Sequence, residues 1–223
     1  MGYGSRQNAA SGFPKILATR LSQLRVAVDV QHLYRTGRHA KDHGSIYTLK
    51  DGTHIAEADA ATLYAGALTA WLRRRGALVL TNDPSRGILS GPYSTRNSEA
   101  DVWGAQAYIA CHLNAGGGTY AVFEYMGGTI GSTLAMWASR QVQHDFSVLI
   151  SLGRSMAIDP AHRGAVCIEP VSRTMSAVIS EPFFGDNPAQ QELFALAKLT
   201  LLGESIGEGI AQWWERRAVA SVA

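Results

Sequence analysis

The sequence predicts a single α/β domain in which a twisted, mostly parallel β-sheet carries helices on both faces. Short apolar runs rich in β-branched residues alternate along the chain with segments of helical periodicity, which is the pattern of a covered parallel sheet. The chain has 223 residues, of which 46% are hydrophobic, and this is enough to bury one core. Because neither a repeat nor a linker interrupts the pattern, we expect one domain over residues 21–223, preceded by a polar lead segment at residues 1–20.

The first predicted strand is Arg25–Val30, a run with the apolar, β-branched character of a buried strand. A polar stretch that contains glycine and histidine follows from Gln31 to His54. Loops of this length inside compact domains are usually functional or disordered. We therefore expect a long loop between the first strand and the first helix.

The first predicted helix runs from Glu57 to Arg75. Apolar residues recur at helical spacing as far as Trp71, and the three arginines at the carboxyl end complement the helix dipole. Gly76 follows and suits the end of a helix. The apolar run at residues 77–81 then predicts the second strand.

The middle of the chain predicts a loop, a helix and two strands. Residues 82–93 are rich in turn formers and indicate a loop, whereas residues 96–103 are predicted to be helical. Strands are predicted at residues 108–111, which are apolar throughout, and at residues 120–125, which alternate. Three successive glycines at positions 116–118 predict a tight turn between these strands.

The last part of the chain predicts two helices and one further strand. Residues 132–145 have helical character, and Ser132 is a candidate cap for that helix. Residues 177–179 form the last predicted strand. Asn187 precedes a proline, which is a typical helix start, so we expect the final helix to begin there and to run to about Arg217.

Charge, cysteine content and the start of the chain exclude several classes of protein. The formal net charge is +2 and the pI is near 8.6, which is too weakly basic to indicate nucleic-acid binding. Cys111 and Cys167 are too few for a disulfide scaffold, and their spacing leaves open whether they pair. The polar start lacks the pattern of a secretory signal, and no apolar run is long enough to span a membrane. We therefore expect a protein that is made in the cytoplasm and does not insert into membranes.

Polar residues follow three of the predicted strands, at the point where each strand ends. His32 and His112 come after apolar runs, and Glu181 closes the last one. Taken alone, a histidine after a strand is more often a loop residue than a metal ligand, and a glutamate there is usually just solvated. Together they form a different pattern, because ligand sites in such sheets gather at the ends of the strands. Catalytic zinc commonly takes three ligands from histidine and acidic residues and leaves one position for water.

Three blocks of the sequence resemble a known family. In the first block, the strand that ends at His32 is followed by an Asp-His-Gly-Ser loop at 42–45 and by Glu57 at a helix start. The second block, residues 104–115, ends in His-Leu-Asn-Ala, and the third is Glu-Pro-Phe-Phe-Gly-Asp-Asn at 181–187. With these blocks, the chain from about Arg25 to Trp214 resembles the zinc-dependent N-acetylmuramoyl-L-alanine amidases, a family that includes many phage endolysins.

The chain departs from the pattern of that family at three positions. Gln31 stands before His32 where the family has a glycine, Asn82 stands in place of an arginine, and Gln106 stands in place of an aspartate. These departures indicate a divergent member of the family.

The resemblance implies roles for particular residues. One zinc ion per chain would be held by His32, Glu57 and His112, and Glu181 would be the catalytic acid/base. Asp59 is the alternative third ligand, because it begins the same helix, but successive helical residues are rotated by about 100° and the two acids cannot both face one metal. The resemblance also indicates Asn114 and Arg96 as substrate-binding residues, although packing is an equal alternative for Arg96.

The remaining histidines are weaker candidates. Three of them lie in the long loop between the proposed ligands, where one could line the cleft or support a ligand; these are His39, His43 and His54. His144 and His162 have no partner pattern and are interpreted as structural.

The resemblance implies a peptidoglycan hydrolase that cleaves the amide bond between N-acetylmuramic acid and the L-alanine of the stem peptide. Without an export signal, we expect a phage-type endolysin that reaches the wall after release from the host cytoplasm. The expected partner is bacterial peptidoglycan, with neither nucleic acid nor a membrane involved. Two alternatives stay open, a zinc peptidase that acts within the stem peptide and a degenerate cell-wall-binding module, although a binding module has no need of Glu181 as a base.

Overall fold

The sheet predicted from the sequence is present in the computed structural model, which describes residues 21–33, 43–169 and 174–220. The predicted lead segment, residues 1–20, lies outside the described residues. The central sheet has six strands in the order β4-β1-β5-β8-β6-β7. Their bounds are Arg25–Val30 for β1, Leu78–Thr81 for β4, Ala107–Cys111 for β5, Ala121–Met126 for β6, Gly153–Ile158 for β7 and Ser176–Glu181 for β8.

Most neighbouring strands of this sheet are parallel. β1 pairs in parallel with both β4 and β5, and β5 pairs in parallel with β8. β6 runs antiparallel to β8 and parallel to the edge strand β7. The predicted α/β fold class is therefore confirmed, and the carboxyl ends of β1, β5 and β8 meet at one edge of the sheet.

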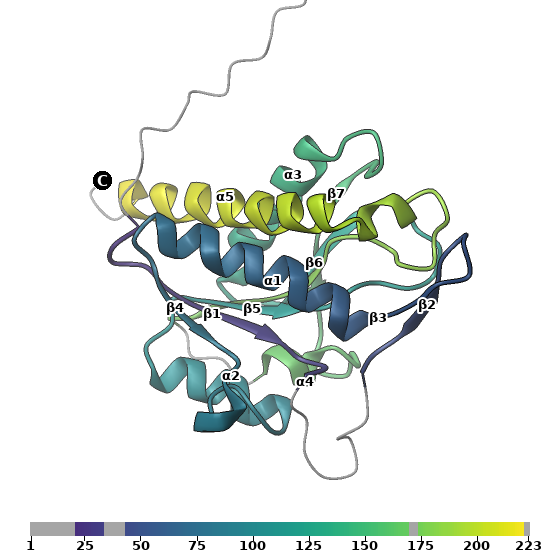
Figure 1. The fold of residues 1–223 in the computed structure, drawn as a ribbon. Coiled ribbons are helices and arrows are strands. Elements are labelled where there is room, and N and C mark those ends of the chain that lie inside the picture. Colours follow the sequence, from purple (N-terminus) through teal and green to yellow (C-terminus); the bar gives the residue numbers. More distant parts are fainter. Residues whose placement is uncertain (1–20, 34–42, 170–173, 221–223) are drawn as a thin grey trace, which may run out of the picture.

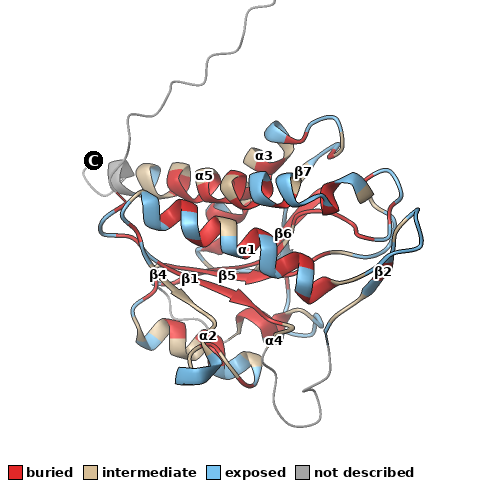
Figure 2. Cartoon of the chain, viewed as in Figure 1, coloured by how far each residue is buried: buried red, intermediate tan, exposed pale blue. Residues whose placement is uncertain are grey.

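Helices cover both faces of the sheet (Figure 1). On one face lie α1 (Glu57–Arg74), α3 (Gly131–Asp145) and α5 (Leu196–Ala220). On the other face lie α2 (Tyr93–Val102) and the short α4 (Ala165–Ile168). β1 and β5 are buried between the two layers, whereas the outer faces of the helices are exposed (Figure 2). Within the part of the chain that the structure describes, no helix is long and apolar enough to cross a membrane.

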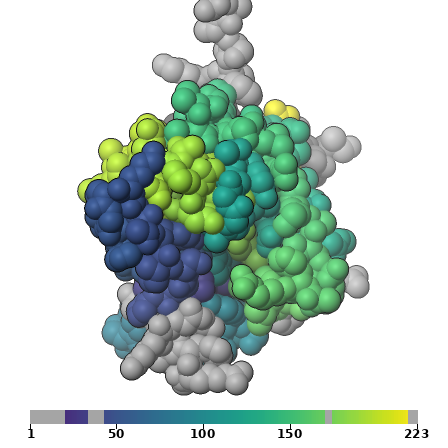
Figure 3. Space-filling model, turned by 90° about the vertical axis from the view of Figure 1, so that its right-hand side faces the viewer, coloured from purple at the N-terminus to yellow at the C-terminus, as the bar shows by residue number. Residues whose placement is uncertain are grey.

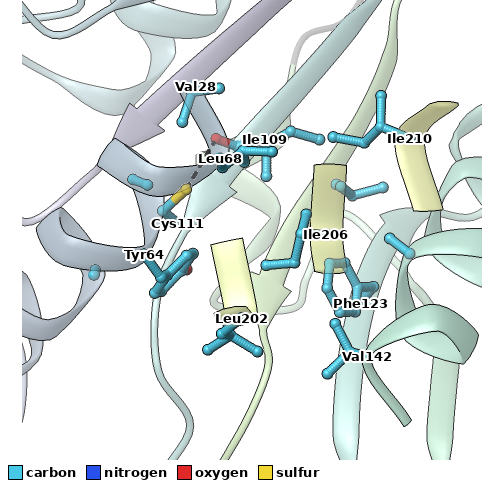
Figure 4. Close-up of a cluster of buried hydrophobic side chains, with 14 of the residues drawn as sticks. Val28, Tyr64, Leu68, Ile109, Cys111, Phe123, Val142, Leu202, Ile206 and Ile210 are labelled. Carbon is cyan, nitrogen blue, oxygen red and sulfur yellow. Dashed lines mark hydrogen bonds between the residues drawn. The ribbon is translucent and has the colours of Figure 1, made fainter. Parts of the chain in front are cut away.

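The alternation of side chains along the strands divides the core into two parts. Val26, Val28 and Val30 of β1 face the layer of α1 and α5, and Ala27 faces α2 and α4. The larger cluster lies under α1, α3 and α5, where side chains from the sheet meet those of the helices (Figure 4). Residues labelled in that view are Val28, Tyr64, Leu68, Ile109, Cys111, Phe123, Val142, Leu202, Ile206 and Ile210.

Glycine lets α5 approach its two neighbouring helices closely. A Cβ atom on Gly203 would lie 2.2 Å from the carbonyl oxygen of Tyr64 in α1, and one on Gly209 would lie 2.7 Å from the Cα of Ala138 in α3. Any larger residue at either position would push the helices apart. This close packing holds α1, whose first residue belongs to the candidate site described below.

The structure differs from the sequence prediction where local signals were weak. The predicted loop of residues 31–54 contains β2 (Ile46–Thr48), which forms a hairpin with β3 (His54–Ala56). β7 was not predicted, because most of its residues are exposed at the sheet edge and it lacks an apolar run. The short α4 was also not predicted. α2 begins at Tyr93, ahead of the predicted start, and α3 begins at Gly131, so Ser132 lies inside its first turn.

The predicted start of the last helix was wrong. The side-chain oxygen of Asn187 accepts a hydrogen bond from the backbone N–H of Ala189 at 2.9 Å, which makes a local turn. A 3-10 helix, η3, follows at Gln191–Phe194, and α5 begins only at Leu196. At Asn187 an asparagine followed by a proline therefore marked a turn and not a helix start. A second 3-10 helix, η2, lies elsewhere in the chain, at Pro84–Arg86.

Candidate metal centre

Three predicted ligands meet at the carboxyl edge of the sheet. His32 follows β1, His112 follows β5, and Glu57 is the first residue of α1. The Oε1 atom of Glu57 lies 3.0 Å from Nδ1 of His112 and 3.3 Å from Nε2 of His32. The two imidazole rings are nearly perpendicular, with centroids 4.8 Å apart. The potential ligand atoms of the three residues all lie within 4.8 Å of one another.

Backbone donors fix the carboxylate of Glu57. Its Oε1 atom accepts a hydrogen bond from the N–H of Leu113, and its Oε2 atom accepts one from the N–H of Ser45, both at 3.0 Å. Gly44 is required beside it, since a Cβ at that position would lie 2.5 Å from Oε2 and the residue has a positive φ of 77°. Burial alone would raise the pKa of Glu57, but hydrogen bonds to His112 and His32 outweigh it and hold this pKa well below its usual range.

The three side chains fit the requirements of a zinc ion. Zinc binds histidine nitrogen and carboxylate oxygen at about 2.0–2.1 Å in tetrahedral geometry, which sets neighbouring ligand atoms about 3.3 Å apart. The separations of 3.3 and 3.0 Å from Glu57 Oε1 to the two histidine nitrogens are close to this value. The set also resembles the two-histidine, one-glutamate ligand set known for catalytic zinc.

The alternative ligand Asp59 lies outside this group. Its side chain is exposed, whereas Glu57 is buried and faces both histidines. Among the histidines of the predicted loop, His43 and His54 are exposed, and His54 is hydrogen-bonded to Thr48 at 3.1 Å. His39 lies outside the described residues.

A cavity of about 810 Å³ opens beside the three ligands. Figure 3 looks onto this side of the molecule, where the surface is recessed between the blue segment around β2 and β3 and the green segment around β7 and α4. His32, Glu57 and His112 line the cavity together with Glu181, the last residue of β8. The structure therefore places the predicted ligands and the predicted acid/base in the lining of one cavity.

The environment of Glu181 changes its acidity. Burial, and then the negative charges of Glu124 and Glu57, raise the pKa of Glu181 to about 8. Arg163 acts in the opposite direction, but more weakly. A carboxyl group with such a pKa can take up and release a proton near neutral pH.

Sequence reasoning missed two further residues of this cavity. Glu124 is a buried acid in β6, and burial raises its pKa as well. His162 was interpreted as structural, but it lines the same cavity, with its Nδ1 atom 3.9 Å from the Oε2 of Glu124. The position of Glu124 inside an otherwise apolar strand is the sequence signal that could have identified it. His162 carried no such signal, because it lies in a turn before α4.

Asn114 also lines the cavity, at the end of the second sequence block. Its backbone N–H donates to the carbonyl oxygen of Phe183 and its carbonyl oxygen accepts from Gly185, each at 3.0 Å. The third block is thus joined directly to the second. Its last two residues bind the glycine turn, since Asp186 accepts hydrogen bonds from the N–H groups of residues 116 and 117, and Asn187 donates to the carbonyls of residues 117 and 118.

Arg96 does not line the cavity. Its side chain is fully buried and pairs with Asp29 of β1, with NH1 at 2.9 Å from Oδ1. It also donates to the carbonyl oxygens of Gly91 and Leu33. These partners hold the segment that follows β1 and occupy the guanidinium group. Of the two roles predicted for Arg96, the structure therefore favours packing.

Both cysteines are buried, and neither forms a disulfide. Cys111 belongs to β5 and packs in the larger core cluster, whereas Cys167 belongs to α4 on the opposite face of the sheet. The two thiols are therefore separated by the sheet and do not pair.

No protein-family model matches this sequence, and no curated protein is significantly similar to it. Solved structures do resemble it. The N-acetylmuramoyl-L-alanine amidase AmiC2 of Nostoc punctiforme superposes with a TM-score of 0.66 at 16% identity, covering 86% of this chain and 98% of the amidase. The amidase Ami1 from Mycobacterium smegmatis gives 0.65 at 15% identity, covering 87% and 98%.

The catalytic domain of the CD27L endolysin, which targets Clostridia difficile, gives a TM-score of 0.51 at 18% identity, covering 85% of this chain and 97% of that domain. At such low identities the likeness concerns the fold. The fold of this chain is that of the N-acetylmuramoyl-L-alanine amidases.

Proposed function

We propose that this chain is a zinc-dependent N-acetylmuramoyl-L-alanine amidase, which hydrolyses the amide bond between N-acetylmuramic acid and the L-alanine of the peptidoglycan stem peptide. The proposal rests on one observation above all, the meeting of a His-Glu-His ligand set and the partly buried carboxyl group of Glu181 in one cavity. The likeness in fold to solved amidases supports it. One zinc ion per chain is expected, because the three side chains make a single set.

His32, Glu57 and His112 would hold the zinc ion. When bound there, zinc supplies Lewis-acid chemistry, which acidifies water and polarises the carbonyl group of the scissile amide. The backbone hydrogen bonds on Glu57 keep its carboxylate in place for this purpose, since they come from Leu113 and Ser45 on two different segments.

Glu181 is the proposed catalytic acid/base. It takes a proton from the attacking water and gives one to the leaving amine. Its raised pKa suits both steps, because the carboxyl group has to hold the proton for part of the cycle. A dication in the cavity would lower this pKa, since a nearby opposite charge favours the carboxylate, and this moves the carboxyl toward its base form.

The cavity offers room for the two parts of the substrate, a sugar and a peptide. Its volume of about 810 Å³ lies in the range of cavities that hold small organic ligands. Asn114 is the proposed substrate-binding residue, because it lines the cavity directly beyond His112 while its backbone is fixed on Phe183 and Gly185. The likeness to the CD27L endolysin domain supports a lytic role of the phage-endolysin kind.

The test is digestion of purified peptidoglycan by the purified protein, with mass analysis of the products and measurement of bound zinc. Stem peptides with a free L-alanine amino terminus are expected, together with about one zinc per chain. Chelation should abolish the reaction, and added zinc should restore it. Cleavage inside the stem peptide would instead indicate a peptidase, and binding to the wall without release of peptides would indicate a degenerate binding module.

A further inference from the structure

A buried glutamine contacts the candidate metal centre through the ring nitrogen of His112 that does not face Glu57. Gln31 lies between the end of β1 and His32, and its side chain is fully buried. Its Oε1 atom is 3.0 Å from Nε2 of His112. Its Nε2 atom is 2.9 Å from the carbonyl oxygen of Cys167 and 2.9 Å from the hydroxyl oxygen of Tyr108.

The partners of this amide determine its orientation and the protonation of the histidine. The carbonyl oxygen of Cys167 can only accept a hydrogen bond, so the NH₂ group of Gln31 must face it. Oε1 then faces His112, and since this oxygen can only accept, the Nε2 atom of His112 must carry a proton. The Nδ1 atom faces Glu57 at 3.0 Å, and it is the ring nitrogen whose proton a metal ion would replace.

The orientation of Gln31 is itself secured by a buried ion pair. Tyr108 accepts from the amide of Gln31, so its own hydroxyl proton points to Oδ2 of Asp29, at 2.6 Å. The other carboxylate oxygen of Asp29 accepts from Arg96 at 2.9 Å and from Asn82 at 2.7 Å. Every member of this network except Asn82 is fully buried, so water does not compete for these hydrogen bonds.

We propose that Gln31 is a positioning residue of the metal centre, which holds the ring of His112 in place with the proton on Nε2 and thereby presents Nδ1 to the metal. The inference rests on the proposed function, because it assumes that His112 is a ligand. It gives a role to a residue at which the sequence departs from the family pattern. It also connects Asp29 and Arg96, which do not reach the cavity, to the ligand set.

The experiment measures zinc affinity of the full chain by competition with a chromophoric chelator, and so does not depend on activity. Gln31→Met keeps the length of the side chain but removes the acceptor. Loss of such a partner typically weakens metal binding by about 10- to 100-fold, and we expect a loss in that range. Gln212→Met is the matched control, since Gln212 donates to Gln141 between α5 and α3, and its affinity should equal that of the wild type.

A second variant separates positioning from simple packing. Gln31→Glu retains an acceptor for the Nε2 proton of His112 but loses both N–H donors and buries a charge. If Gln31 acts through His112, this variant should bind zinc more tightly than Gln31→Met. If Gln31 only fills space and binds Cys167 and Tyr108, Gln31→Glu should bind zinc more weakly than Gln31→Met. That result would overturn the inference.

Tyr108→Phe keeps the inference testable if the Gln31 variants fail to fold. It removes the hydroxyl that joins Gln31 to Asp29, and a smaller but measurable loss of zinc affinity is expected, whereas unchanged affinity would count against the network. The proposed function fails separately, if the wild-type chain binds no zinc. Wild-type zinc binding with unchanged affinity in Gln31→Met would overturn the inference alone.

Discussion

The Oε1 atom of Glu57 lies 3.0 Å from Nδ1 of His112, although 55 positions of sequence separate the two residues. One residue begins α1 and the other follows β5, and both are reached by the chain at the carboxyl edge of the sheet. His32 joins them from the end of β1, at 3.3 Å from the same oxygen. Backbone donors from Leu113 and Ser45 hold the carboxylate of this cluster in place.

The first prediction concerns Glu181. Glu181→Gln preserves the shape of the side chain but cannot accept a proton from water, so turnover should fall by about two to four orders of magnitude. Zinc content should be unchanged, because Glu181 is not part of the ligand set. Turnover and zinc are measured on one sample, and near-normal turnover with zinc present would remove the assignment. Glu192→Gln is a control on η3, and its rate should change by less than about threefold.

The second prediction separates metal ligands from their neighbours. His112→Ala and Glu57→Ala should each lose bound zinc and activity together, because each removes one of the three proposed ligands. Asp59→Ala and His144→Ala should retain both, since these side chains are exposed and stand apart from the cluster. Zinc is measured by atomic emission after exhaustive dialysis. Retention of zinc by Glu57→Ala would show that the third ligand is wrong.

The third prediction follows from the raised pKa of Glu181 and applies to the metal-free protein. The pKa of Glu181 is about 8 in the fold and near 4.5 in the unfolded chain. The contribution of this carboxyl group to the free energy of unfolding is therefore complete below pH 4.5 and is lost as the pH rises toward 8. Glu181→Gln has no ionisable group at this position, so its free energy of unfolding does not fall for this reason. The variant should therefore be more stable than the wild type above pH 8, by on the order of 1–2 kcal/mol, and should lose this advantage near pH 4.5.

Urea unfolding at a series of pH values, with chelator present, measures this difference. If the difference in unfolding free energy between the two proteins is the same at all pH values, the pKa of Glu181 is not raised in the fold. With zinc bound the gap at high pH should shrink, since the positive charge favours the ionised carboxylate.

The fourth prediction concerns the ion pair of Arg96 and Asp29. Both side chains are fully buried, so Arg96→Met leaves a carboxylate without its charged partner, and this should cost about 3–5 kcal/mol of unfolding free energy. Arg74→Met is the matched control, because the Arg74–Glu204 pair is largely exposed and should be worth less than about 1 kcal/mol. Both values come from urea titration at pH 7. Equal small losses would show that the buried pair adds little.

Local patterns in the amino-acid sequence were enough to locate the candidate ligands along the chain. An apolar run that stops at a polar residue is a local signal, and it marked His32, His112 and Glu181 at the ends of strands. The evidence for the helix that starts at Glu57 was equally local, since it consists of the spacing of apolar residues and the arginines at the carboxyl end. These signals sufficed for the fold class, because strands and helices that alternate leave few ways to cover an apolar sheet.

Which of these residues come together depends on the packing of the whole chain. The choice of Glu57 over Asp59 depends on the rotation of α1 against the sheet, which its packing with α5 sets. Glu124 reaches the cavity because β6 lies beside β8, a neighbour relation that no stretch of the sequence encodes alone. Gln31 and Arg96 became parts of one buried network because hydrogen bonds form between residues 136 and 67 positions apart. Propensity and periodicity act over a few residues, whereas strand order and burial are set by the whole chain at once.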